Sequence, residues 1–308
     1  MKALLFGGSG QLGTALIPIL SDRFELMAPK RRSVNPWGNL SDPEKIAETI
    51  RSVKPQIVIN AAAFTNVDQA ETDPAIAALV NRDSVKAMAG VCREIDSVFI
   101  HFSTDYVFSG AGHKPWTEND PASPINCYGN TKLQGENAIR ESGVRRAAII
   151  RTSWLCGRGG KNFLHSILHA ASQGKDLSVI DNEIGIPTSA EFLARVSFLI
   201  LEKLLNTTEN AVLTFHAVPD GKPVSRFQFA QWIVDEAARL RPELSFKKSR
   251  IILVSSLIPP RPARRPRNSV LDNHLVKQFL GIGELPVWQT VLRPVLEFQV
   301  TQLGSSDR

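Results

Sequence analysis

The 308-residue sequence predicts an α/β protein with a doubly wound parallel sheet of the Rossmann type and a smaller C-terminal lobe. In residues 1–151, short apolar runs alternate with amphipathic stretches, as expected where helical crossovers join parallel strands. After residue 151 the sequence reads mainly as helical stretches separated by loops containing Pro and Gly. We therefore expect a sheet domain at 1–151 and, at 152–308, mainly a second lobe whose chain crosses back to the first domain.

The individual elements follow from apolar periodicity and from end signals. Residues 2–6 form an apolar run that stops at glycines, and Asp42-Pro43-Glu44 provides an N-cap, a first-turn proline and an acidic first turn. Strands are predicted at 2–6, 24–28, 56–60, 98–102 and 147–150, with a short one ending at 39–40. Helices are predicted at 11–20, from Pro43 onwards, and at 74–94, 162–173, 190–205 and 225–239.

The composition excludes several classes of protein. Apolar residues make up 43% and charged residues 21%, which excludes a disordered chain. The net charge of +6 is concentrated locally in two small basic clusters, 30–32 and 261–267, without a zinc-ligand or RNA-binding motif, so no nucleic-acid partner is expected. No apolar run reaches the ~20 residues of a membrane span, so no membrane partner is expected either. Three scattered cysteines suit a reducing cytoplasm.

Three glycines stand at the turn between the first strand and the first helix. In such a turn the first glycine permits a tight bend, the second lets the backbone approach a pyrophosphate, and the third lets helix and strand pack closely. The helix N-terminus then faces the anion. The turn therefore predicts that residues 1–151 bind a dinucleotide, in preference to a purely structural role. The contacts expected from it are Gly7, Gly10, Gln11, Leu12 and Gly13.

The residues after the second strand predict which nicotinamide cofactor is used. A carboxylate here accepts a hydrogen bond from a ribose hydroxyl, whereas Arg or Lys pairs with the 2′-phosphate of NADPH. Lys30 and Arg31 occupy this place with no acid beside them, so NADPH is favoured while NADH stays possible; the alternative is a solvated basic loop. Further cofactor contacts are expected from Asn39, Leu40, Ala61, Ala62 and Ala63.

Tyr128 precedes Lys132 by four residues at the start of a predicted helix, so both lie on one helical face. We expect the ammonium to lie beside the phenol and to lower its pKa from ~10 towards neutrality. A tyrosine tuned in this way can give a proton to a carbonyl group as it is reduced. The spacing alone is common, and an ordinary surface helix would also produce it.

Ser-Thr-Asp-Tyr-Val-Phe at 103–108 follows a buried strand, so its hydroxyls are expected at the carboxyl edge of the sheet. Thr104 can then hydrogen-bond a substrate carbonyl oxygen while Tyr128 protonates it. Lys132 would hold both the phenolate and the cofactor's ribose, and Ser103 is expected beside the cofactor.

Several motifs occur in a fixed order along nearly the whole chain. They are the glycine turn, Asn-Ala-Ala-Ala at 60–63, the 103–108 motif, Tyr-Gly-x-Thr-Lys-x-x-Gly-Glu at 128–136 and Arg-Thr-Ser-Trp at 151–154. In this combination the sequence resembles the dTDP-4-dehydrorhamnose reductases, which are extended short-chain dehydrogenases/reductases. The likeness includes 185–188 and 265–272. It implies a cytoplasmic oxidoreductase that uses NADPH to convert dTDP-4-dehydro-6-deoxy-L-mannose to dTDP-L-rhamnose for surface polysaccharide.

The resemblance also implies roles for single residues. Tyr128 would be the proton donor with Lys132 as its partner, and Thr104 and Asp105 would contact the sugar.

Three further residues would bind the substrate, each with a plainer alternative. Trp154 would pack on the hexose or base, unless it is an ordinary buried indole. Asn162 resembles a nucleotide-sugar contact but could equally cap a helix. Arg265, in the basic segment 264–268, would reach the substrate's pyrophosphate, with a solvated loop as the alternative.

Two residues depart from the family pattern. Lys30 replaces an acid common in relatives, and Ala15 stands where some relatives have a glutamate used in a metal-bridged dimer. No metal is therefore expected, and a homodimer is left open.

One alternative function is reduction of a related 4-keto nucleotide sugar, because hydroxyl recognition depends on the second lobe. Another is a non-catalytic NADP-binding regulatory subunit, against which the intact Thr104, Tyr128 and Lys132 argue.

Overall fold

The computed structural model describes residues 1–31, 37–207, 209–243, 246, 249–255 and 261–303. Its larger part is a six-stranded sheet in the order β10-β5-β4-β3-β1-β2, and every neighbouring pair is parallel. The strands are β1 (Lys2–Phe6), β2 (Glu25–Met27), β3 (Ile57–Asn60), β4 (Val98–Thr104), β5 (Arg146–Thr152) and β10 (Ala211–His216). The predicted doubly wound parallel sheet is confirmed.

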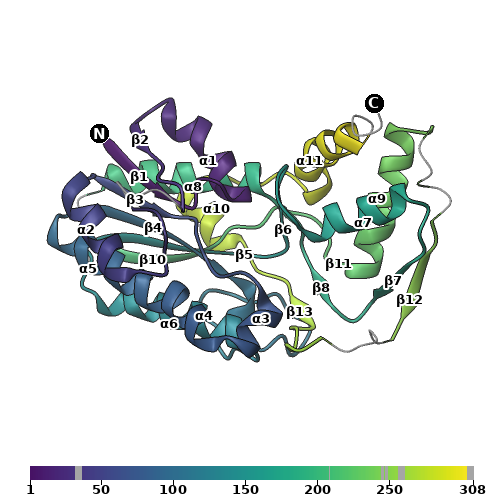
Figure 1. Ribbon diagram of the computed structural model, residues 1–308, viewed down its shortest axis with the longest axis horizontal. Coiled ribbons are helices and arrows are strands. Elements are labelled where there is room, and N and C mark those ends of the chain that lie inside the picture. The colour runs from purple at the N-terminus through teal and green to yellow at the C-terminus, as the bar shows by residue number, and fades with distance from the viewer. Residues whose placement is uncertain (32–36, 208, 244–245, 247–248, 256–260, 304–308) are drawn as a thin grey trace.

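Helices cover both faces of this sheet (Figure 1). Successive residues of a strand point to opposite faces, so Leu5 and Ile59 pack in one core while Leu4 and Val58 pack in another. The first core contains residues of α1 (Gln11–Ser21), α8 (Ala190–Leu205) and α10 (His274–Leu280). The second contains residues of α2 (Pro43–Val53), α5 (Ser84–Glu94) and α6 (Cys127–Glu141).

Two predictions of local structure were wrong or incomplete. No strand ends at 39–40; this segment instead makes loop hydrogen bonds, such as Trp37 Nε1 donating to Asn39 O at 2.8 Å. The helix expected at 74–94 is confirmed in its bounds, but α4 (Pro74–Ala78) continues through a π-helical segment (Leu79–Asp83), which was not predicted, into α5. The short α3 (Val67–Thr72) and the 3₁₀ turn Asp105–Val107 were not predicted.

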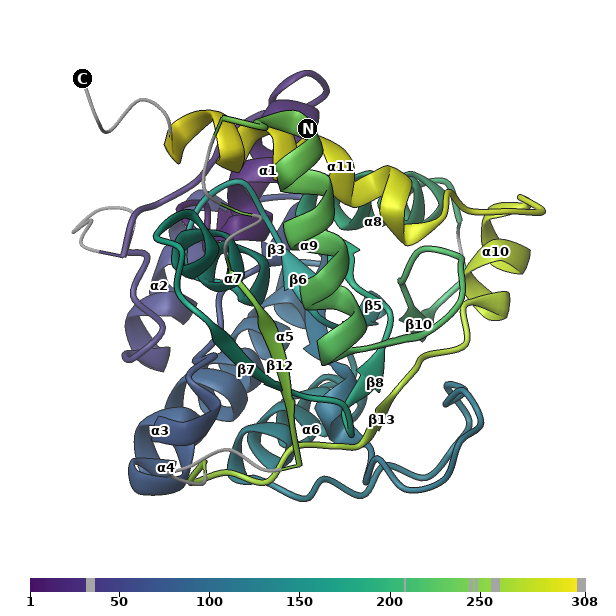
Figure 2. The same cartoon turned by 90° about the vertical axis from the view of Figure 1, so that its right-hand side faces the viewer.

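The smaller lobe has its own apolar core, in which helix residues such as Ile167, Ile233 and Leu292 pack together. Its helices are α7 (Phe163–Ser172), α9 (Arg226–Leu240) and α11 (Trp288–Leu303). Figure 2 shows α9 in front, with the ribbon of β7 (Leu177–Ile180) and β12 (Ile251–Val254) below it. Short strands β11 (Val224–Ser225), β8 (Ile184–Gly185) and β13 (Asn268–Ser269) form a three-stranded sheet, and β6 (Leu155–Cys156) pairs with β9 (Thr188–Ser189).

The chain returns to the large sheet after entering the lobe. β10 pairs with β5 over six residues, and α8 packs against α1. We therefore infer a sheet domain that includes 190–216, and a lobe whose segments flank that return. Among the described residues, no helix is both long and apolar enough to cross a bilayer.

Candidate active site

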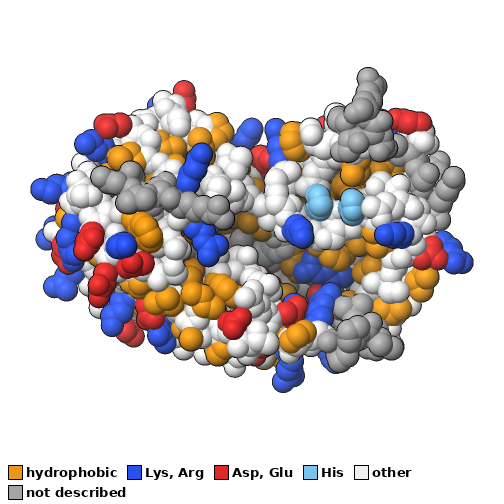
Figure 3. All heavy atoms as spheres, viewed as in Figure 1, with side chains coloured by type: hydrophobic (Ala, Val, Ile, Leu, Met, Phe, Trp, Pro, Cys, Tyr) orange, Lys and Arg blue, Asp and Glu red, His pale blue; other side chains and the backbone are white. Residues whose placement is uncertain are grey.

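A cavity of about 830 Å³ opens at the carboxyl edge of the sheet. It lies where the strand order reverses, since β1 has β2 on one side and β3 on the other, and ligands bind at such points in open α/β sheets. The space-filling view shows the surface hollowed between the sheet domain and the lobe (Figure 3). This cavity is lined by the glycine turn, the loops after β3 and β4, the start of α6, and the segments 152–156 and 159–163.

The glycine turn has the geometry that its sequence predicts. Gly7 has φ 84°, and a Cβ there would lie 2.6 Å from Ala62 N, so only glycine fits. Gly13 does not line the cavity, but a Cβ on it would overlap Gly7 O, so its missing side chain lets α1 pack on the turn. Gly10, the N-cap, makes no side-chain capping bond, which leaves the first amides of α1 for an anion. The turn therefore fits a dinucleotide pyrophosphate.

The residues predicted for the far end of the cofactor are largely gathered in the cavity. Its lining includes Arg31, Asn39, Leu40 and all of 61–63, together with Gln11, Leu12 and Ser103. Lys30 does not line it, and Arg32 lies outside the described residues. Within the described lining the one carboxylate is Asp105, which follows β4, so no acid of the lining stands after β2 to repel a 2′-phosphate from Arg31.

Helix α6 places Tyr128 at the cavity. Asn126 caps the helix by accepting a hydrogen bond from Gly129 N at 2.8 Å, so Tyr128 stands in the first turn. Thr104, at the end of β4, also lines the cavity; its hydroxyl donates to Asp105 Oδ1 at 3.0 Å and accepts from the Tyr106 amide at 3.1 Å. The rings of Tyr106 and Tyr128 meet edge to face at 5.8 Å.

Burial sets the protonation of Tyr128 and Asp105. It raises the pKa of the Tyr128 phenol above its ordinary value, the charge of Asp105 adds to this, and a hydrogen bond with Thr104 opposes it. The expected lowering of that pKa was therefore wrong, and the phenol keeps its proton at neutral pH. Burial also raises the pKa of Asp105 to about 6.

Lys132 is buried and does not hydrogen-bond the phenol. Its Nζ donates to Phe102 O at 2.6 Å and lies 3.2 Å from His101 Nε2. The expected pairing with Tyr128 is replaced by these contacts, because a buried amino group needs nearby hydrogen-bond partners and the end of β4 supplies them. Burial lowers the pKa of Lys132 to about 8, and the charge of Glu136 opposes this.

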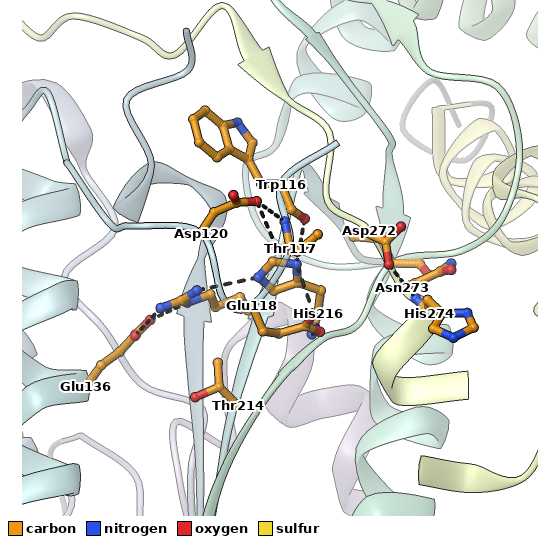
Figure 4. A network of polar contacts seen from close by, with 12 residues as sticks. Trp116, Thr117, Glu118, Asp120, Glu136, Thr214, His216, Asp272, Asn273 and His274 are labelled. Carbon is orange, nitrogen blue, oxygen red and sulfur yellow. Dashed lines mark hydrogen bonds and ion pairs between the residues drawn. The ribbon is translucent and has the colours of Figure 1, made fainter. Parts of the chain in front are cut away.

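A buried ionic network joins α6 to the sheet one turn beyond Lys132. Glu136 receives two hydrogen bonds from Arg151 of β5, at 2.9 and 2.7 Å. Arg151 Nη1 lies 3.5 Å from His216 Nε2 of β10, and His216 Nδ1 lies 3.0 Å from Trp116 O. Figure 4 shows Glu136, His216 and Trp116 converging in this way. The network fixes the helix that carries both predicted catalytic side chains.

The lobe contributes an indole and an amide. Trp154 lines the cavity but is only 9% exposed, with the Arg226 guanidinium 3.6 Å above its ring, so it is both a packed indole and a wall of the site. Asn162 caps α7 by accepting from His165 N, which matches the simpler alternative. It also lines the cavity and donates to Gln11 Oε1 at 2.8 Å, which ties the lobe to the glycine turn.

Arg265 does not reach the cavity, contrary to expectation. It forms a two-point ion pair with Asp68 of α3, at 2.8 and 2.7 Å, and this carboxylate holds the guanidinium outside the lining. Arg226 and Tyr106 line the cavity instead, and sequence reasoning missed both. Ser225 and Gln228 form a capping box that marks the start of α9, but no local signal shows that Arg226 faces the site.

No group of three or more His, Cys, Asp or Glu side chains suited to a metal ion occurs in the described part of the chain.

Comparisons with known proteins agree with this geometry. The family model described as the RmlD substrate binding domain matches residues 1–300. A dTDP-4-dehydrorhamnose reductase of Escherichia coli K12 is 38% identical over 296 residues, covering 96% of this chain and 97% of that protein. One from Burkholderia thailandensis is 35% identical, covering 94% and 96%.

Solved structures of dTDP-4-dehydrorhamnose reductases also superpose on this chain. A dTDP-4-dehydrorhamnose reductase from Clostridium acetobutylicum superposes with a TM-score of 0.83 at 29% identity, covering 99% of this chain and 100% of that one. One from Bacillus anthracis, solved with NADP, has a TM-score of 0.82 at 25% identity, covering 98% and 99%. The resemblance stated from the motifs is confirmed: the chain belongs to the dTDP-4-dehydrorhamnose reductase family of NAD(P)-dependent oxidoreductases.

Proposed function

We propose that this protein reduces the 4-keto group of dTDP-4-dehydro-6-deoxy-L-mannose with NADPH, giving dTDP-L-rhamnose for surface polysaccharide. The observation that carries the proposal is one cavity that joins the glycine turn to Thr104, Tyr128 and Lys132. The names of the relatives support the substrate, and the relative solved with NADP supports the cofactor. We also propose the cytoplasm as its location, where its three free thiols stay reduced.

When bound, NADPH supplies the hydride. Tyr128 gives its phenolic proton to the carbonyl oxygen, which is the role of a general acid whose pKa burial keeps above the working pH. Thr104 turns its hydroxyl from Asp105 to the same oxygen, so two placed donors meet the charge that develops there. Lys132 supplies a hydrogen bond from beneath the site to the cofactor's ribose.

The chain's own residues account for the choice of cofactor. The glycine turn and the open first turn of α1 receive the pyrophosphate, since neither side chains nor a cap obstruct them. Arg31 pairs with the 2′-phosphate through its planar guanidinium. NADH gains no such contact, so NADPH is preferred and NADH is a weaker substitute.

The substrate then fills the part of the cavity between Asp105 and the lobe. Trp154 forms part of the wall that the hexose or base would meet, and Arg226, stacked on its ring, offers a cation to the diphosphate. Asp105 accepts a hydrogen bond from a sugar hydroxyl. All of these side chains come from one chain, so a single subunit forms a complete site, while a homodimer remains compatible with it.

The test is a substrate panel. Purified protein is offered dTDP-4-dehydro-6-deoxy-L-mannose and related 4-keto nucleotide sugars with NADPH or NADH, and loss of reduced nicotinamide is followed. The proposal expects the highest kcat/KM for the named sugar with NADPH. A higher value for a sugar of another configuration would assign the protein to that sugar, and no turnover with any of them would support a non-catalytic subunit.

A further inference from the structure

A carboxylate outside the cavity contacts the arginine that the lobe contributes to its wall. Strands β11 and β8 pair antiparallel with Ser225 opposite Ile184, so Arg226 and Glu183 are the next pair along the register. The Arg226 amide donates to Glu183 O at 3.1 Å, which extends this pairing by one residue. Side chains of directly opposite residues lie on the same face and meet. Arg226 lines the cavity, and Glu183 does not.

The Glu183 carboxylate accepts from two guanidinium groups, one on each oxygen. Arg226 Nε donates to Oε2 at 3.3 Å, and Arg261 Nη1 donates to Oε1 at 2.8 Å. The side chains of Glu183 and Arg226 are 8% and 13% exposed, so water has little access to the contact between them. Because each oxygen has its own partner, the carboxylate is held in one orientation.

Two aromatic rings lie against the same guanidinium. Its central carbon is 3.6 Å from the centroid of the Trp154 ring and 4.9 Å from that of Phe163. The bond to Glu183 uses the N–H on Nε, and the Nη nitrogens donate to no described residue. The Nη groups form a planar fork that suits a phosphate. The fork is therefore held in place and has its donors free for an anion in the cavity.

The guanidinium lies near the residues expected to hold the sugar. Burial raises the pKa of Asp105 to about 6, and the charge of Arg226 opposes this rise. Asp105 directly follows Thr104, and both line the cavity together with Arg226. A phosphate group bound by the fork would therefore bring the sugar attached to it close to Thr104.

We propose that Glu183 is a positioning residue for the substrate's diphosphate: it holds Arg226 through Nε so that the Nη fork binds the phosphates. The inference rests on the function proposed above. The negative charge of Glu183 also has an opposite effect, since it repels a phosphate. Loss of positioning weakens binding of a diphosphate, whereas loss of repulsion strengthens it, so the sign of the effect in a neutral variant decides between them.

The first test is calorimetric titration of dTDP into protein saturated with NADP⁺, which fills the cofactor site. Glu183→Gln keeps the length and volume of the side chain and removes its charge. We expect the dTDP dissociation constant to rise about tenfold, as for the loss of one charge-assisted contact, with NADP⁺ binding unchanged. An unchanged or lower dTDP dissociation constant in the variant, or no dTDP binding by the wild type, would overturn the proposal.

Glu236→Gln is the matched control. Glu236 of α9 is also a buried carboxylate between two arginines, accepting from Arg239 Nη1 at 2.9 Å and from Arg293 Nε at 2.8 Å. Neither of these arginines lines the cavity. This variant should lose stability in denaturant unfolding but keep the wild-type dTDP dissociation constant. A loss of dTDP affinity equal to that of Glu183→Gln would indicate a general effect of weakening the lobe and contradict the proposal.

A double-variant cycle asks whether Glu183 acts through Arg226. Arg226→Met keeps an unbranched side chain against Trp154 but removes the fork, so the dTDP dissociation constant should rise about tenfold or more. Adding Glu183→Gln to Arg226→Met should weaken dTDP binding no further, because the group that Glu183 positions is already gone. Losses that add up in the double variant would refute a role through Arg226.

The kinetic counterpart is a split between KM and kcat. With the named sugar and NADPH, Glu183→Gln should raise KM for the sugar about tenfold and change kcat little, because the diphosphate contact is the same in the ground and transition states. A lower kcat at an unchanged KM would contradict the proposal. If the protein fails to reduce this sugar, the dTDP titrations still decide the role of Glu183, so the two failures are distinguishable.

Discussion

Replacing Arg151 with Met should destabilise the protein and loosen the helix that carries the catalytic candidates. The side chain donates twice to Glu136, whose carboxylate is fully buried. Without Arg151, the ion pair that the carboxylate makes with Arg140 remains, and the Arg140 side chain is 37% exposed; a hydrogen bond with Ser103 also remains. Methionine fills most of the arginine's volume, so the change removes mainly the charge and its hydrogen bonds.

The magnitude follows from what remains buried. Removing one partner of a buried ion pair typically costs 3–5 kcal/mol, because the other charge is left uncompensated. The remaining contact with Arg140 reduces this, so we expect a loss of about 3 kcal/mol in the free energy of unfolding. Replacing Glu136 with Leu in the Arg151→Met background should recover most of it, since an apolar pair needs no compensation.

Denaturant unfolding of the two single variants and the double variant measures the coupling. The expected coupling energy is about 2 kcal/mol or more, with Arg151→Met also lowering kcat because α6 carries Tyr128. A single-variant loss below about 1 kcal/mol, or a double-variant loss equal to the sum of both singles, would refute the reasoning about the network.

Three further predictions concern single residues. Tyr128→Phe should lower kcat by ~10²-fold or more while leaving the NADPH dissociation constant nearly unchanged, since only proton donation is lost; near-normal turnover would exclude Tyr128 as the acid. Arg31→Asp should erase an NADPH preference of roughly tenfold to a hundredfold in kcat/KM, and equal wild-type values for both cofactors would show that Arg31 binds no phosphate. Asp105→Asn should stabilise the protein at pH 7 but not near pH 3. Burial raises the pKa of Asp105 to about 6 in the folded state, so the wild type loses stability as pH rises from about 4 through 6, whereas asparagine does not ionise. The difference of about two pKa units corresponds to about 3 kcal/mol, and a variant-minus-wild-type difference in unfolding energy that does not change with pH would contradict it.

Local patterns predicted much of this molecule. Alternating apolar runs located the main strands, because a strand buried on both faces must be apolar throughout. The need for glycine at position 7 was predictable from the turn motif, and it is confirmed because a Cβ there would lie 2.6 Å from Ala62 N. The strand predicted at 39–40 was wrong: among the described residues the sheet ends at β2, and the segment makes loop hydrogen bonds instead.

The rest of the site depends on contacts between distant residues. Lys132 was predicted to meet Tyr128 from helical spacing, but the depth of its side chain and the carbonyl of Phe102 decide its partner. Arg265 pairs with Asp68, 197 positions away in the sequence, and no local signal predicts that ion pair. Arg226 enters the cavity because the lobe folds over it, which spacing along the chain does not reveal.

We propose that hydride reaches C4 of a 4-keto sugar in this site and that Tyr128 gives the proton of the new hydroxyl. The most direct measurement is single-turnover reduction of dTDP-4-dehydro-6-deoxy-L-mannose with NADPH deuterated at nicotinamide C4, followed by NMR of the nucleotide sugar. The account predicts deuterium at C4 of dTDP-L-rhamnose in the wild type and little product from Tyr128→Phe in the same time. Deuterium at another carbon, the opposite C4 configuration, or equal product from the variant would contradict it.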